Sequence, residues 1–113
     1  MRVSAIAISA TLLVFVMVSC IANKGVFVLV NKAKEPITRV LVTVCGQTIE
    51  MKDIQPTKSA LGSYKVTSDS HYNIRVEFQS GKKLQKEMGY VTNGVDFHHE
   101  IVVIDTDINL MKK

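Results

Sequence analysis

Residues 72–78 alternate strictly between apolar and polar side chains, and this two-residue period constrains the fold more than any other feature of the chain. The apolar positions are Tyr72, Ile74, Val76 and Phe78, and the polar ones are Asn73, Arg75 and Glu77. Successive side chains of a β-strand point to opposite faces, so this pattern predicts a strand with one buried face. Nowhere after Lys24 does a sustained period of 3.6 residues with capping residues indicate a helix.

Five further segments favour strands. Residues 40–45 alternate between valines on one face and mixed side chains on the other. Residues 26–30 and 101–104 are short continuous apolar runs rich in β-branched side chains, which is typical of strands buried on both faces. Residues 48–51 and 84–90 predict a short strand and a weaker strand, respectively.

Turn residues separate these runs. Proline breaks a strand ladder because it has no N–H to donate, and it does so within residues 34–36 and 54–57. Gly46 follows the 40–45 strand, Ser80-Gly81 predicts a compact hairpin, and Asn93-Gly94 is a strong turn dipeptide. The pattern predicts a single all-β domain, an antiparallel β-sandwich of about seven strands or a small barrel, over residues 26–113.

The N-terminus has the order of features of a secretory leader. Arg2 provides a positive charge, residues 3–18 are apolar except for Ser4, Ser9 and Thr11, and small Ser19 precedes Cys20. The ending Met17-Val18-Ser19-Cys20 resembles a bacterial lipobox, although Met17 stands where that pattern prefers leucine. The resemblance implies a signal peptide over residues 1–19 with a signal helix, lipid on Cys20, and a short tether over residues 20–25.

Two alternatives to the lipoprotein interpretation stay open. Residues 3–22 carry no charge, and about 20 apolar residues suffice to span a bilayer as a retained helix. A plain signal peptide cut at another position is the third alternative. Without lipid on Cys20, a disulfide between Cys20 and Cys45 would be allowed. In lipoproteins, aspartate after the cysteine resembles an inner-membrane retention signal, so Ile21 favours the outer membrane.

Size and charge limit the class of protein. A chain of 113 residues with 47% hydrophobic and 21% charged residues fits one globular domain behind an apolar leader. The net charge of +4 is scattered, whereas a nucleic-acid binder shows a dense basic stripe with aromatic residues. The charge instead fits a mildly positive surface near anionic lipid. The whole pattern resembles small immunoglobulin-like or transthyretin-like bacterial lipoproteins.

The segment 96–100 is the most suggestive cluster for metal binding. Histidine and carboxylate side chains bind zinc or copper, and Asp96, His98 and His99 are the candidates. On a strand, Asp96, His98 and Glu100 point one way, and Phe97 and His99 point the other. Adjacent histidines alone lack the spacing of a zinc site, so a solvated strand end is the simpler interpretation.

Catalytic motifs are not evident. Cys45 ends a strand beside apolar neighbours, which favours a buried structural thiol over a nucleophile. Ser63 lacks the G-x-S-x-G elbow, and residues 105–109 imitate a calcium loop but have Leu110 where glycine is required. We therefore expect neither enzyme activity nor a cofactor. By alternation Tyr72 belongs in the core, and Tyr90 is expected to be exposed.

These observations favour a membrane-anchored periplasmic lipoprotein that binds another protein by a loop or an edge strand. Its role would be in envelope assembly, in inhibition of a hydrolase or in immunity to a toxin. The partner-binding residues are unknown from the sequence. The alternative is a carrier of metal or a small ligand that uses Asp96, His98 and His99.

Overall fold

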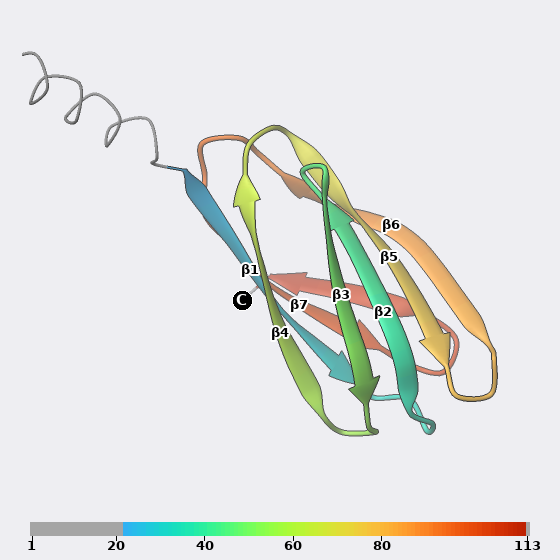
Figure 1. The fold of residues 1–113 in the computed structure, drawn as a ribbon. Helices are drawn as coiled ribbons and strands as arrows, with labels where there is room; N and C mark the ends of the chain where they lie inside the picture. The colour runs from blue at the N-terminus through green and yellow to red at the C-terminus, as the bar shows by residue number, and fades with distance from the viewer. Residues whose placement is uncertain (1–21, 113) are drawn as a thin grey trace, which may run out of the picture.

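The computed structural model describes residues 22–112, and these residues form a two-layered β-sandwich (Figure 1). The eight strands are β1 (Asn23–Asn31), β2 (Ile37–Val44), β3 (Gln47–Ile54), β4 (Ser59–Val66), β5 (Ser70–Phe78), β6 (Lys83–Val91), β7 (Phe97–Val103) and β8 (Ile108–Lys112). One sheet has the order β4-β1-β7-β8, and the other has the order β3-β2-β5-β6. The prediction of an all-β sandwich is confirmed, with eight strands instead of about seven. The expected signal peptide and Cys20 lie outside the described residues.

β1 is an inner strand of its sheet. It pairs antiparallel with β4 and parallel with β7, while the other pairings within residues 22–112 are antiparallel. A parallel pair needs a long crossover connection, and here the chain from β2 to β6, which includes the whole second sheet, lies between β1 and β7. β1 begins at Asn23, which is in register with Val66. The tether predicted up to Gly25 is therefore wrong at its end, since residues 23–25 already belong to the domain.

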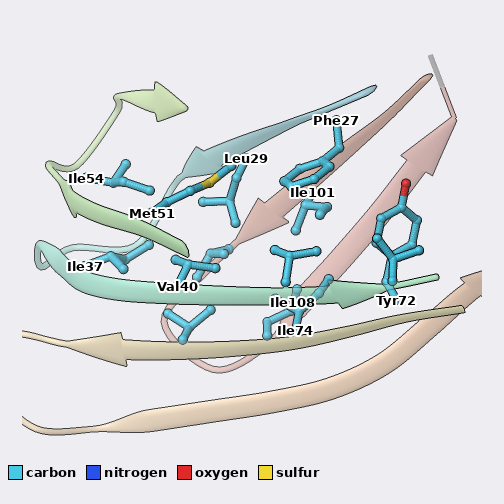
Figure 2. Packing of buried hydrophobic residues seen from close by; sticks show 14 of the residues in the cluster. Phe27, Leu29, Ile37, Val40, Met51, Ile54, Tyr72, Ile74, Ile101 and Ile108 are labelled. Carbon is cyan, nitrogen blue, oxygen red and sulfur yellow. The ribbon is translucent and has the colours of Figure 1, made fainter. Parts of the chain in front are cut away.

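The core lies between the two sheets (Figure 2). Phe27 and Leu29 of β1 face Val40 of β2 and Ile74 of β5, and all four side chains are fully buried. Burying an aliphatic or aromatic side chain of this size stabilises the folded state by about 1.5–3 kcal/mol. The strict alternation of residues 72–78 is confirmed, because β5 buries every second side chain from Tyr72 onward.

One buried amide joins the end of β1 to the end of β3. Asn31 is fully buried, and its Nδ2 donates to the carbonyl oxygens of Ile54 at 2.9 Å and Glu35 at 3.1 Å. Its Oδ1 accepts from the backbone N–H of Ala33 at 2.9 Å. Asn31 thus satisfies three backbone groups of the β1–β2 connection and of β3, which fixes the path of the chain from one sheet to the other.

The turns follow the chemistry read from the sequence. Ser80-Gly81 closes the β5–β6 hairpin, and the Gly81 N–H donates to the Phe78 carbonyl at 2.9 Å. Cys45 and Gly46 form the two-residue β2–β3 turn with φ values of +50° and +69°, as a type I′ turn requires. Tyr90 is 82% exposed, which confirms its predicted position on the surface.

Candidate protein-binding face

The outer face of the β4-β1-β7-β8 sheet presents aliphatic side chains. Its middle row follows the strand register from Leu61 through Val28 and Glu100 to Met111. The neighbouring rows add Val26, and Val30 beside Val102. Leu61 is 73% exposed and Met111 is 49% exposed, the three β1 valines and Glu100 are half-buried, and Val102 is buried. We call the set Val26, Val28, Val30, Leu61, Val102 and Met111 the valine face.

Polar side chains border the valine face. Ser63 and Ser59 of β4 lie beside Val26 and Val30, respectively, and both serines are exposed. Asn109 of β8 borders Val102 on the other side and is also exposed. An apolar centre with a rim of hydrogen-bonding groups is the usual anatomy of a protein–protein interface.

The outer face of the second sheet differs in chemistry. Arg39 of β2 lies between two carboxylates, 3.0 Å from Glu77 and 3.8 Å from Glu50. Lys52 lies 3.7 Å from the other oxygen of Glu50. Leu41 is half-buried among these charged neighbours, in register with Glu50 and Arg75. With its ion pairs and exposed charges, this face resembles an ordinary solvated surface, so the aliphatic character is specific to one side of the sandwich.

Side chains from one sheet close part of the edge of the other. The Gln47 amide of β3 donates to the Lys65 carbonyl at 2.8 Å and accepts from the Lys65 N–H at 3.0 Å. On the opposite side, Lys86 of β6 donates to the Ile108 carbonyl at 2.9 Å and to Asp107 at 3.0 Å. Edge strands protected in this way are poorer templates for strand addition. Parts of the β4 and β8 edges are therefore less open to strand addition than a bare edge strand would be.

A buried chain of polar groups crosses the core behind this sheet. The hydroxyls of Tyr64 and Tyr72 are 2.6 Å apart, and the Tyr72 hydroxyl lies 2.9 Å from Nδ1 of His99. All three residues are buried, and burial raises the pKa values of both tyrosines. Burial, with help from Lys112 and His98, lowers the pKa of His99, so the imidazole is neutral at physiological pH.

Gly25 makes this chain of groups possible. The Tyr64 ring lies across Gly25, and a Cβ at that position would be 2.0 Å from Cζ of Tyr64. Tyr72 meets both Tyr64 and His99 edge to face, and Phe97 stacks on His99 at 5.5 Å. This cluster was not predicted from the sequence, although the predicted placement of His99 and Phe97 on one strand face was a signal for it. The arrangement specifies how the strands pack and exposes no reactive group.

The three residues considered for a metal site do not converge. His99 is buried against Tyr72, whereas His98 is exposed on the other face of β7. Asp96 accepts hydrogen bonds from the Lys24 N–H at 2.8 Å and from the Asn23 side chain at 3.1 Å, which lowers its pKa. Within residues 22–112, no three His, Cys, Asp or Glu side chains form a group that could hold a metal ion.

Cys45 is a buried free thiol in the described structure. Its Sγ lies 3.4 Å from the Ser68 carbonyl, and its N–H donates to the Ser70 hydroxyl at 3.0 Å. The buried position expected from its apolar neighbours is confirmed. Ser63 lies exposed on β4, at the rim of the valine face.

In the part of the chain that is described, no helix has the length and apolar character needed to cross a membrane.

Comparison with known proteins gives the fold alone. No family model matches the chain, and no curated protein matches it. An NMR structure of a protein from Eubacterium rectale is similar, with a TM-score of 0.58 and 16% sequence identity. The match covers 80% of this chain and 88% of the other.

Proposed function

We propose that this chain is a lipid-anchored protein of the bacterial envelope that binds another protein through the valine face and catalyses no reaction. The aliphatic outer face of the β4-β1-β7-β8 sheet is the observation that carries the proposal. Isolated exposed apolar side chains are ordinary, but aliphatic side chains that gather on one outer face of a sheet, around the single carboxylate Glu100 and beside polar groups, favour an interaction site. The expected partner presents an apolar surface edged by hydrogen-bonding groups.

The N-terminal leader supports the proposed location at the membrane. The small residue Ser19 followed by Cys20 is what a cleaved lipoprotein signal needs, and Ile21 favours the outer membrane with the domain facing the periplasm. Each buried methylene of an acyl chain contributes about 0.8 kcal/mol, so several chains hold a domain firmly while one holds it weakly. Envelope assembly, hydrolase inhibition and toxin immunity all need a protein partner at this location.

The anchor is tested by the intact mass of the membrane-extracted chain beside that of a Cys20→Ala variant. We expect a mass that matches acylated residues 20–113, and we expect the substitution to abolish it. A full-length mass without lipid would show that the leader is retained, and the anchor would then be a helix.

The binding face is tested by crosslinking and copurification from envelopes. Leu61→Glu is expected to weaken capture of the partner about tenfold or more, because burying a leucine contributes about 1.5–3 kcal/mol. Leu41→Glu is the matched control, since it places the same charge on the outer face of the other sheet. Loss of the partner with Leu41→Glu, and its retention with Leu61→Glu, would assign binding to the wrong face and refute the proposal.

A further inference from the structure

At the end of the sandwich where β1 begins, the carboxylate of Asp96 joins the β6–β7 connection to β1. Figure 1 shows the start of β1 beside the connection between β6 and β7. Asp96 of this connection bonds to the Lys24 N–H and the Asn23 side chain, so the loop is held against the first residues of β1. A second carboxylate, Asp69, accepts from the Asn93 N–H at 2.8 Å in the same loop. Both acidic groups are thus occupied by hydrogen-bond donors of this end.

Lysines gather at the same end. Lys24 of β1 and Lys65 of β4 are in register on the outer face, and both are exposed. Like charges directly opposite each other on paired strands are destabilising, so an anionic surface placed against this pair would relieve the repulsion. Lys112, at the end of β8, lines a hollow of about 360 Å³ together with Val95, Asp96, Phe97 and His98.

Two exposed apolar side chains flank the β6–β7 connection. Tyr90 precedes it and is 82% exposed, and Val95 lies within it and is 47% exposed. Tyrosine has an apolar ring and a polar hydroxyl, and it is enriched at the headgroup level of membranes for that reason. Lysine next to such side chains adds attraction to anionic lipid.

We propose that this end, defined by Lys24, Lys65, Tyr90, Val95 and Lys112, lies on the headgroup layer of an anionic bilayer. The lysines meet lipid phosphates, and Tyr90 and Val95 insert between headgroups. The inference rests on the proposed membrane anchorage. Only two residues separate Cys20 from Asn23, and the three steps between them reach at most about 10 Å, so the anchor brings this end to the membrane before any other part of the domain.

The chain has no tryptophan, so a single introduced one reports its own depth. Tyr90→Trp and Val95→Trp probe the membrane-contact end, and Leu61→Trp is the control. Leu61 pairs with Val28, four residues along β1 from Lys24, or about 13 Å farther from the membrane. Each full chain is reconstituted into phosphatidylglycerol–phosphatidylcholine vesicles whose acyl chains are brominated near the carbonyl end. We expect a blue shift and loss of emission for the tryptophans at positions 90 and 95, and neither change at position 61.

The charge contribution is tested in the Tyr90→Trp background. Lys24→Gln/Lys65→Gln/Lys112→Gln is expected to lower quenching to the level seen in pure phosphatidylcholine vesicles. Its matched control, Lys32→Gln/Lys58→Gln/Lys83→Gln, removes the same charge from exposed positions at the opposite end and leaves quenching unchanged.

The outcomes separate the two proposals. A chain that floats with vesicles but keeps full emission at positions 90 and 95 retains its anchor and overturns the membrane-contact end. A chain that does not float lacks the anchor, and both proposals about the membrane fall together. Quenching at position 61 instead of 90 would place the valine face on the bilayer, which contradicts both this inference and protein binding by that face.

Discussion

Removal of the Tyr72 hydroxyl tests whether the buried chain from Tyr64 to His99 acts as one unit. Tyr72→Phe leaves two buried groups without their partner, the Tyr64 hydroxyl and Nδ1 of His99. An orphaned buried polar group costs about 1–3 kcal/mol, so we expect Tyr72→Phe to lower the free energy of unfolding by about 2–4 kcal/mol. That is a large share of the roughly 5–15 kcal/mol by which domains are stable.

Tyr64→Phe is the matched comparison at the end of the chain. It removes one hydrogen bond but leaves Tyr72 paired with His99, so we expect a loss of about 0.5–1.5 kcal/mol. In the double variant Tyr64→Phe/Tyr72→Phe, the orphaned Tyr64 hydroxyl is absent. The double variant should therefore be more stable than Tyr72→Phe alone.

The assay is equilibrium urea unfolding followed by far-UV circular dichroism, because tyrosine fluorescence changes with the substitutions themselves. Additivity of the two single effects within about 0.5 kcal/mol would refute the reasoning, since contacting groups in one network should show coupling. A Tyr64→Phe loss larger than the Tyr72→Phe loss would contradict the central position of Tyr72.

Three further perturbations follow from the same contacts. Burial lowers the folded-state pKa of His99 below its ordinary value of 6.5, so the unfolded chain binds more protons as the pH falls. Stability should be fully present well above pH 6.5 and fall as the pH drops through 6.5 towards the lowered folded-state pKa, and His99→Gln should reduce that fall in urea unfolding. Gly25→Ala places a Cβ 2.0 Å from the Tyr64 ring, so it should cost about 1–3 kcal/mol and abolish the coupling between Tyr64 and Tyr72 in the same double-variant cycle. Asn31→Ala leaves the groups it bonds without partners and should lower the midpoint of thermal unfolding by the equivalent of about 2–4 kcal/mol, whereas exposed Asn109→Ala should change it by less than about 0.5 kcal/mol.

The sequence predicted the strands whose alternation is local. The alternation of residues 72–78 predicted β5, and Ser80-Gly81 predicted its hairpin with β6. β4 was missed because its buried positions include Gly62, while its neighbour Leu61 points outward and is exposed. Gly62 is buried for a reason outside its own strand. The Phe27 ring of β1 lies against it, and a Cβ there would be 2.3 Å from that ring.

The valine face is the place where the predicted burial and the observed burial of a strand disagree. The apolar runs 26–30 and 101–104 predicted strands covered on both faces. Residues 101–103 are buried as expected, but the outward valines of β1 are only half-buried. The amino-acid pattern of β1 is thus that of a strand covered on both faces, whereas residues 22–112 cover only its inner face fully. The proposed partner would cover the outer face. For the cluster around His99, the sequence indicated only that His99 and Phe97 share a strand face. Its contact with Tyr72 joins strands of different sheets, 27 residues apart in the sequence.

The place of β1 in its sheet determines how the domain would carry a pulling force. In the proposed lipoprotein the anchor joins β1 at Asn23, and a partner on the valine face would grip the same strand at Val26, Val28 and Val30. β1 is held by β4 on one side and β7 on the other, so a pull along its axis must slide both ladders at once instead of opening their bonds one after another. Tension between the membrane and the partner would thus pass along a single inner strand, loaded in shear, and the second sheet would bear little of it.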